Sequence, residues 1–325
     1  MSEHGGDLDK AIQFYGGKKC QWIDLSTGIN PNPYPIPKLK ITDWQKLPTL
    51  DEIESLEFLI KSKFKTSLEI ALVSGAQTAI NFLPFLLEKR SVNILVPTYN
   101  EYQLCFQDAG WNVRLSKEFN QLFSSEVVII VNPNNPDGKT HKIKDLINLS
   151  KSVDILIIDE SFIDLSENKS IISEIDSGIK NIIVIRSFGK FFGLAGMRLG
   201  FILSNSKINK KFKRNLGPWP VSKMSIKIAE RAIQDNIWIR KTSMYLNNWS
   251  ILLDQLMEVI NWKIIGGTNL FRLYSTPNSD LAQKFLAESY IWSRKFSYSK
   301  KWLRLGIPCI EGFKRLKIIV ESLKV

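Results

Sequence analysis

Six short apolar runs, separated by segments of helix length, occupy the middle of the chain. They are continuous rather than alternating, and continuous apolar strands are typical of a parallel sheet that helices cover on both faces. The sequence therefore predicts an α/β fold, with a large three-layer αβα domain around a mostly parallel sheet. The six runs are LEIALVSG (68–75), SVNILVP (91–97), EVVIIVN (126–132), DILIIDE (154–160), NIIVIRSF (181–188) and LGFILS (199–204).

The C-terminal part of the chain has a different pattern. A helical region near 221–260 is followed by the apolar run WKIIGGTNLFRLYS, a helix near 279–289, the short runs IWSRKF and WLRLGIP, and a closing amphipathic helix. This mixture predicts a smaller α+β domain. We expect an N-terminal arm over 1–45 that contributes to the small domain and the substrate site, a large domain over 46–240, and the small domain over 241–325.

Composition is that of an ordinary globular protein. The 325 residues are 44% hydrophobic, enough for a large core, and the apolar runs are far shorter than the ~20 residues that span a bilayer. The net charge of +12 is spread along the chain without an RNA-binding motif, so we expect no nucleic-acid partner. Cys20, Cys105 and Cys309 lack metal-ligand spacing, and the first residues do not resemble a secretion signal. These features predict reduced thiols, no metal and a cytoplasmic location.

Polar residues and a proline follow the predicted strands. Ser74, Pro97, Asn132, Asp159 and Ser187 each lie at or just after the end of an apolar run. The carboxyl ends of parallel strands meet at one edge of a sheet, where such folds bind their ligands. We therefore expect these positions to surround one site.

One lysine in the segment SFGKFFGLAGMRLGF (187–201) lies in an unusual context. Lys190 follows a strand and is flanked by aromatic residues and glycines, although lysines usually lie on the solvated surface. Burial disfavours the charged ammonium, and the neutral amine can form a Schiff base with an aldehyde. Lys190 is therefore a candidate for the covalent capture of pyridoxal phosphate (PLP).

A carboxylate and an amide fit the same cofactor. Asp159 ends an apolar run, where a buried carboxylate needs a cationic partner. A protonated pyridine nitrogen is one such partner, and its protonation makes the ring an electron sink; a salt bridge to a core arginine is the alternative. Asn135, in VNPNNPDGK, can donate a hydrogen bond to the phenolate oxygen of the cofactor. The alternative is that this segment is only a turn.

The phosphate of such a cofactor needs its own ligands. A strand-to-helix turn begins at Ser74, where backbone N–H groups and the helix dipole favour an anion. A hydroxyl and a guanidinium flank Lys190 and suit a phosphate. Tyr99 fits either stacking on a cofactor ring or simple packing. The phosphate ligands expected from this pattern are Ser74, Gly75, Ala76, Gln77, Ser187 and Arg198.

The order of these motifs resembles that of the PLP-dependent aminotransferases of fold type I, over nearly the whole chain. A phosphate turn, PTY, NPNNPDG, DE and SFGK followed by arginine occur in that order. The resemblance implies that fold, with PLP as cofactor. It implies that Lys190 is the catalytic lysine that binds PLP, that Asp159 contacts the pyridine nitrogen and that Asn135 contacts O3′. The other cofactor-binding residues would be Ser74, Gly75, Ala76, Gln77, Tyr99, Phe162, Ser187 and Arg198.

Within that family the chain resembles the threonine-phosphate decarboxylases of corrinoid biosynthesis. The segments HGGDLDKA, DLSTGINPNPYP, PTYNEY, LGPWPVS and WLRLGIP carry this likeness. It implies a PLP-dependent carboxy-lyase that converts L-threonine O-3-phosphate to (R)-1-amino-2-propanol O-2-phosphate in cobalamin biosynthesis. It also implies a homodimer.

The same resemblance suggests where the substrate binds. Arg304 in WLRLGIP matches the arginine that binds the substrate carboxylate, and Arg294 in IWSRKF matches one that contacts the phosphate; surface or interdomain salt bridges are the alternative. His4, beside two glycines, would close over the substrate phosphate or belong to a disordered terminus. Gly28 and Asn30 would line the same mouth.

Two other functions stay open. Histidinol-phosphate aminotransferases, related by fold, usually have a tyrosine where this chain has Phe162 and another where it has Leu47, which counts against ordinary transamination. An aminotransferase acting on histidinol phosphate or a related phosphorylated amino acid would consume a 2-oxo acid. A PLP-binding protein without turnover is the third hypothesis.

Overall fold

The chain forms two compact units in a computed structural model that describes residues 4–88, 91–175 and 179–322. The large unit comprises the described residues of Tyr34–Asn135 and Thr140–Ile237. The small unit comprises those of Met1–Pro33, Pro136–Lys139 and Trp238–Val325. The domain boundaries expected after residues 45 and 240 stay a prediction.

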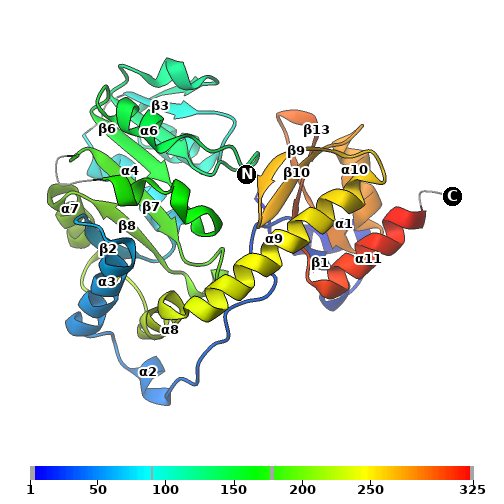
Figure 1. Cartoon of the computed structure of the whole chain (residues 1–325), viewed down its shortest axis with the longest axis horizontal. Helices are drawn as coiled ribbons and strands as arrows, with labels where there is room; N and C mark the ends of the chain where they lie inside the picture. The colour runs from blue at the N-terminus through cyan, green and yellow to red at the C-terminus, as the bar shows by residue number, and fades with distance from the viewer. Residues whose placement is uncertain (1–3, 89–90, 176–178, 323–325) are drawn as a thin grey trace. The chain divides into compact units, whose positions relative to one another are not determined.

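The large unit contains one sheet and the helices that flank it (Figure 1). Its strands are β2 (Glu69–Val73), β3 (Ser91–Leu95), β4 (Asn112–Ser116), β5 (Val127–Val131), β6 (Ile155–Asp159), β7 (Ile182–Ser187) and β8 (Gly200–Ser204). Its helices are α2 (Ile41–Gln45), α3 (Leu50–Phe64), α4 (Ala76–Leu86), α5 (Glu101–Asp108), α6 (Ile143–Ser150), α7 (Ser206–Leu216) and α8 (Lys223–Gln234).

The strand order in this sheet is β2-β8-β7-β6-β5-β3-β4, and β8 runs in the direction opposite to the other six strands. The six strands expected from the apolar runs are present, and the predicted α/β fold with a mostly parallel sheet is confirmed. The sequence pattern missed β4, an edge strand with the half-exposed sequence NVRLS. An edge strand needs no continuous apolar run because one side of it faces solvent.

Side chains alternate between the two faces of this sheet, and the alternation decides which residues reach the site. Val131, Ile157 and Ile185 belong to a core cluster with Ile80 of α4 and Phe106 of α5. On the other face, Phe64 at the end of α3 packs 6.0 Å, between ring centroids, from Phe201 of β8. Asp159 shares the parity of Ile157, whereas Glu160 turns to the opposite face.

Helix α3 illustrates how local sequence fixes an element. The Thr49 hydroxyl accepts a hydrogen bond from the Glu52 N–H at 3.3 Å, and the Glu52 carboxylate accepts one from the Thr49 N–H at 2.9 Å. This reciprocal pair satisfies two N–H groups that a helix start leaves without a helical partner. The helix ends at Lys65, whose φ of 49° lies in the left-handed region.

The small unit contains a four-stranded antiparallel sheet and a short parallel strand pair (Figure 1). Its sheet has the order β12-β13-β10-β9, and β1 pairs with β11. The strands are β1 (Ile23–Asp24), β9 (Lys263–Thr268), β10 (Phe271–Ser275), β11 (Ile291–Trp292), β12 (Arg294–Phe296) and β13 (Ser299–Gly306). The helices are α1 (Leu8–Tyr15), α10 (Ser279–Ala287), α11 (Ile310–Glu321) and α9 (Asn236–Glu258), whose first two residues belong to the large unit.

The N-terminal segment is part of the small unit. Strand β1 places Ile23 opposite Ile291, and the ring of Trp22 contacts that of Trp292 edge-on, 6.3 Å between centroids. Ala11 and Ala287 complete this small apolar cluster. Burial of these aromatic rings holds the start of the chain against residues about 270 positions further along.

The segment Pro136–Lys139, which contains the last three residues of the NPNNPDG motif, also belongs to the small unit. Gly138 lies against β9 so closely that a Cβ there would come within 2.0 Å of the Gly267 carbonyl oxygen. Both residues have positive φ, 69° and 144°. Glycine is therefore required at this approach of two backbones.

Among the helices in the described ranges, none has the length and apolar character needed to cross a membrane.

Candidate cofactor and substrate sites

One edge of the large sheet gathers the residues expected to bind the cofactor. The strands β2, β3, β5, β6 and β7 all end at this edge, and the antiparallel β8 begins there. Gly200, the first residue of β8, lies opposite both Val73 and Ser187 in the strand register. The ends of β2 and β7 are thereby one strand apart, on either side of the segment that follows Arg198.

The turn after β2 forms a cradle for an anion. Gly75 caps α4 with a φ of 83°, and its N–H donates to the Val73 carbonyl at 2.7 Å. A Cβ at Gly75 would lie only 2.5 Å from Nη2 of Arg198, so the guanidinium rests directly on the glycine. Arg198 is exposed, has a φ of 53° and donates to the Ala195 carbonyl at 3.1 Å. A guanidinium at the start of a helix suits a phosphate.

Four further predicted phosphate ligands border this cradle. Ser74 is exposed, and its carbonyl accepts a hydrogen bond from the Thr78 hydroxyl at 2.9 Å. Ala76 and Gln77 are the first two residues of α4, and Ser187 ends β7. Their positions are those expected from the sequence, and their contacts with a phosphate remain a proposal.

Tyr99 lies in the turn between β3 and α5. Its hydroxyl donates to Oε1 of Gln77 at 2.9 Å, and Nε2 of Gln77 donates to the Glu101 carboxylate at 3.2 Å. The ring is half-buried and meets Tyr102 edge-on, 6.5 Å between centroids. These bonds hold the ring at the edge of the sheet beside the phosphate turn.

Asp159, the last residue of β6, is a buried carboxylate held by uncharged donors. Its Oδ2 accepts a hydrogen bond from the Tyr102 hydroxyl at 2.8 Å, and its Oδ1 accepts one from the Ser161 N–H at 2.8 Å. Burial raises the pKa of Asp159, while the bonds from Ser161 and Tyr102 and the charge of Lys190 lower it. The carboxylate therefore lies in a setting where a further cation would be strongly favoured.

Lys190 follows β7, in an aromatic loop. Its Nζ lies 5.5 Å from the centroid of the Phe162 ring, within the range of a cation–π contact. The rings of Phe188 and Phe192 on either side of it stack at 4.2 Å between centroids, and Phe192 is buried. Lys190 is half-buried, and its charge lowers the pKa of Asp159.

Asn135 is half-buried in the loop that follows β5. Its neighbour Asn134 ties this loop to the one after β3: its Oδ1 accepts from the Thr98 hydroxyl at 2.7 Å, and its Nδ2 donates to the Pro97 carbonyl at 2.9 Å. Two loops at the cofactor edge are thus fixed to each other, which limits the positions open to Asn135.

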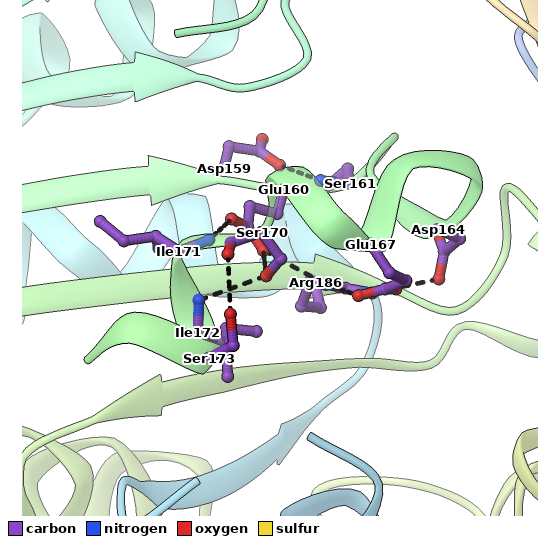
Figure 2. A network of polar contacts seen from close by, with 10 residues as sticks. All are labelled: Asp159, Glu160, Ser161, Asp164, Glu167, Ser170, Ile171, Ile172, Ser173 and Arg186. Atoms are coloured by element: carbon purple, nitrogen blue, oxygen red, sulfur yellow. Dashed lines mark hydrogen bonds and ion pairs between the residues drawn. The ribbon is translucent and has the colours of Figure 1, made fainter. Parts of the chain in front are cut away.

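The buried arginine of this sheet pairs with Glu160, the neighbour of Asp159. Arg186 donates to Glu160 at 3.2 Å and to Asp164 at 3.3 Å, and it also forms an ion pair with Glu167. Glu160 further accepts from the Ser170 hydroxyl at 2.6 Å. Figure 2 shows Asp159 turned toward Ser161 while Glu160 turns the other way, toward Arg186. The salt bridge considered for Asp159 is formed by its neighbour instead.

These features fit pyridoxal phosphate. A glycine cradle under a guanidinium suits the phosphate, a half-buried lysine suits the aldehyde, and a buried carboxylate with uncharged donors suits a pyridinium nitrogen. The cofactor residues predicted from the sequence, from Ser74 to Arg198, all lie in the large unit.

The small unit carries a pair of arginines on neighbouring strands. Arg294 of β12 lies opposite Arg304 of β13, and like charges directly opposite each other destabilise a sheet. Arg304 is buried and donates to the Ser26 carbonyl at 2.6 Å, with its guanidinium 5.0 Å from the centroid of the Phe271 ring. Such a pair is more stable when an anion binds to it.

Electrostatics supports that interpretation. Burial, followed by the charge of Arg294, lowers the pKa of Arg304 to about 9, while Tyr298 and Asp24 raise it. This value leaves the guanidinium protonated at neutral pH. Burial raises the pKa of Tyr298, and both arginines lower it, which puts its phenol near the same pair. The site therefore combines two cations with a neutral hydroxyl.

The remaining predicted substrate residues also belong to the small unit. His4 is exposed, and Gly28 and Asn30 are buried. The Asn30 side-chain oxygen accepts a hydrogen bond from the Asn32 N–H at 2.9 Å. Their contacts with a substrate remain predictions.

Sequence reasoning missed two residues that contact Asp159. Tyr102 is fully buried on α5, and Ser161 lies two positions after the carboxylate. Serine two residues after an aspartate is a common local turn and could have been noticed. The Tyr102 contact spans 57 positions, and only the packing of α5 on the sheet brings it about.

The family and the relatives of the chain agree with this site. The profile of the family "Aminotransferase class I and II" matches residues 22–312, and the chain belongs to this family, whose cofactor is pyridoxal phosphate. The chain is 36% identical over 321 residues to a threonine-phosphate decarboxylase from a Sinorhizobium species, covering 96% of both chains. It is 34% identical to the threonine-phosphate decarboxylase of Pseudomonas aeruginosa, covering 96% of this chain and 95% of that one.

Solved structures agree on the fold. The crystal structure of histidinol-phosphate aminotransferase from Sinorhizobium meliloti in complex with pyridoxal-5'-phosphate has a TM-score of 0.81, at 16% identity, over 99% of this chain and 96% of that one. The expected PLP-dependent transferase fold is therefore confirmed.

Proposed function

We propose that the protein is a PLP-dependent carboxy-lyase that decarboxylates L-threonine O-3-phosphate to (R)-1-amino-2-propanol O-2-phosphate, a step of cobalamin biosynthesis. The observation that carries the proposal is the similarity, over 96% of the chain, to two threonine-phosphate decarboxylases. The paired arginines of the small unit support it, because this substrate brings a carboxylate and a phosphate.

In this proposal the large unit holds the cofactor. Lys190 binds it covalently, Asp159 contacts the ring nitrogen, Asn135 contacts O3′, and Tyr99 and Phe162 border the ring. When bound, pyridoxal phosphate supplies an electron sink for the bond that breaks at the substrate. Lys190, as the amine at the reacting centre, then accepts or returns a proton there. The phosphate ligands are Ser74, Gly75, Ala76, Gln77, Ser187 and Arg198.

The small unit holds the substrate. Arg304 binds its carboxylate and Arg294 its phosphate, with His4, Gly28 and Asn30 around them. Decarboxylation and loss of the α-proton compete at the same carbon. The orientation in which the protein holds the substrate decides which of the two bonds breaks. Tight binding of the distal phosphate would stabilise the substrate orientation in which the bond to the carboxylate breaks.

An aminotransferase acting on histidinol phosphate or a related phosphorylated amino acid is the second candidate. It is favoured by the fold shared with histidinol-phosphate aminotransferase at a TM-score of 0.81. It is disfavoured by Phe162, which is buried beside Lys190 and has no hydroxyl to share a hydrogen bond with Asn135 at O3′.

We also propose a cytoplasmic homodimer. Six large apolar side chains between residues 36 and 58 of the large unit are 60–69% exposed, and a second copy of the chain would cover them. They are Ile36, Ile41, Trp44, Leu47, Leu50 and Phe58. Light scattering after size exclusion should give the mass of two chains, and Trp44→Lys should shift it toward that of one.

The activity is tested with purified, PLP-loaded protein and L-threonine O-3-phosphate. We expect release of carbon dioxide and formation of aminopropanol phosphate without any 2-oxo acid. Lys190→Ala should abolish both, whereas Lys207→Ala, at an exposed lysine of α7, should not. Amino transfer to a 2-oxo acid without gas release would establish the second candidate instead.

A further inference from the structure

Tyr102 is a fully buried residue at the cofactor edge that has no role so far. It lies on α5 with no exposed surface, and its hydroxyl donates to Oδ2 of Asp159 at 2.8 Å. Burial and the neighbouring Asp159 raise the pKa of Tyr102 well above its usual value. The phenol therefore stays protonated and donates across the whole range of physiological pH.

The two oxygens of Asp159 are held separately. Tyr102 binds Oδ2 and the Ser161 N–H binds Oδ1, so the carboxylate cannot rotate without losing one of these bonds. Each oxygen keeps acceptor capacity for a further donor. Both bonds favour the ionised carboxylate against the burial that disfavours it.

We propose that Tyr102 is a positioning residue that keeps Asp159 ionised and fixes its orientation toward the ring nitrogen of pyridoxal phosphate. This inference rests on the proposed contact between Asp159 and that nitrogen. Without the phenol, Asp159 would take up a proton more readily and lose one of the two bonds that fix its plane. The protein would then hold the protonated ring less tightly, because a neutral acid attracts a pyridinium ion much less than a carboxylate does.

The experiment compares two ligands of the apoprotein. Pyridoxal phosphate is titrated into wild type and Tyr102→Phe, and so is its 1-deaza analogue, in which carbon replaces the ring nitrogen. We expect Tyr102→Phe to weaken binding of pyridoxal phosphate about 10-fold, as for loss of a hydrogen bond to a charged group, and to leave the analogue unchanged. We also expect the loss of pyridoxal phosphate on acidification to begin at a higher pH in the variant, because the pKa of Asp159 rises.

Tyr274→Phe is the matched control. Tyr274 is also fully buried, and its hydroxyl also donates to a carboxylate, Asp254 at 2.7 Å, but in the small unit. It should lower the stability of the protein without changing the ratio of the two affinities. Tyr99→Phe removes a hydroxyl that donates to Gln77, and should affect both ligands equally.

The outcomes separate the inference from its premise. Equal weakening of both ligands by Tyr102→Phe would make the residue merely structural and overturn the inference. If Asp159→Asn also fails to discriminate between the ligands, the contact between Asp159 and the ring nitrogen is wrong as well. Should Tyr102→Phe not fold, 3-fluorotyrosine at position 102 keeps the hydroxyl as a stronger donor. It should then move the acid loss of pyridoxal phosphate to lower pH, and an unchanged profile would overturn the inference.

Discussion

Two buried tyrosines, one in each unit, donate to an aspartate, but the charges around the two aspartates differ. In the small unit, Asp254 accepts a hydrogen bond from the Tyr274 hydroxyl at 2.7 Å. It also accepts two from Arg272, from Nε at 2.9 Å and from Nη2 at 2.5 Å. In the large unit, Asp159 accepts from Tyr102 and from a backbone N–H. Asp254 is therefore paired with a cation of the protein, Arg272. The hydrogen bonds that Asp159 accepts come from uncharged groups. The same local chemistry thus stabilises the fold in one place and, in our proposal, prepares the binding of the cofactor ring in the other.

The sharpest test of this comparison is to remove each negative charge in turn. Asp159→Asn should lower turnover on the order of 10²–10³-fold, as for loss of a main electrostatic contact, and leave the apoprotein as stable as wild type or more so. Asp254→Asn should lower the stability of the protein and leave turnover unchanged, because it leaves Arg272 without its ion pair. Turnover and urea unfolding of both variants would check this. A loss of stability in Asp159→Asn would contradict the comparison.

A second prediction concerns Glu160, the neighbour of Asp159 that faces Arg186. Glu160→Gln should lower the free energy of unfolding by about 3 kcal/mol, because it breaks a fully buried ion pair. Glu167→Gln is the matched control: this carboxylate binds the same arginine but is 40% exposed, and the change should cost about 1 kcal/mol or less. Similar losses in both variants would mean that burial does not decide the value of these pairs.

Asp164 makes the same cluster sensitive to pH. Burial raises the pKa of Asp164 to about 6, an effect that Arg186 opposes and Glu167 reinforces, with Glu160 and Lys63 close by. Its folded pKa lies above its unfolded one, so ionised Asp164 destabilises the fold at neutral pH and this penalty fades as pH falls from about 6 toward 4. The change in the free energy of unfolding caused by Asp164→Asn should therefore be more favourable at pH 8 than at pH 4.5, by about 2 kcal/mol. Urea unfolding at both values measures this, and an equal effect at both would contradict it.

The smallest predicted effect concerns the arginines of the small unit. Arg304→Lys should raise KM for L-threonine O-3-phosphate about 10-fold, because an ammonium group cannot form the bidentate pair with a carboxylate that a guanidinium forms. Arg315→Lys, at a half-buried arginine that donates to the Gln21 carbonyl, is the control and should leave KM unchanged. A fall in kcat with unchanged KM would instead give Arg304 a role in the reacting centre.

Most of the fold could be predicted from the sequence, and so could the positions of the candidate cofactor residues at the ends of the strands. Continuous apolar runs such as VVIIV of β5 identify buried parallel strands, and Lys190 and Asp159 lie where those strands end. The edge strand β4 was missed because most of its residues are exposed or half-buried and it has no continuous apolar run. The Tyr102 partner of Asp159 and the Arg186 partner of Glu160 could not be predicted, because strand alternation sends the adjacent acids to opposite faces, where α5 and the neighbouring strand β7 supply these donors.

The most direct test of the central claim is the protonation state of the bound cofactor's ring nitrogen. The protein is loaded with pyridoxal phosphate labelled with ¹⁵N in the ring, and the nitrogen chemical shift is recorded at pH 8 in wild type, Asp159→Asn and Asp254→Asn. We predict a protonated nitrogen in wild type and Asp254→Asn and an unprotonated one in Asp159→Asn. An unprotonated nitrogen in wild type, or a protonated one that does not depend on Asp159, would contradict the account.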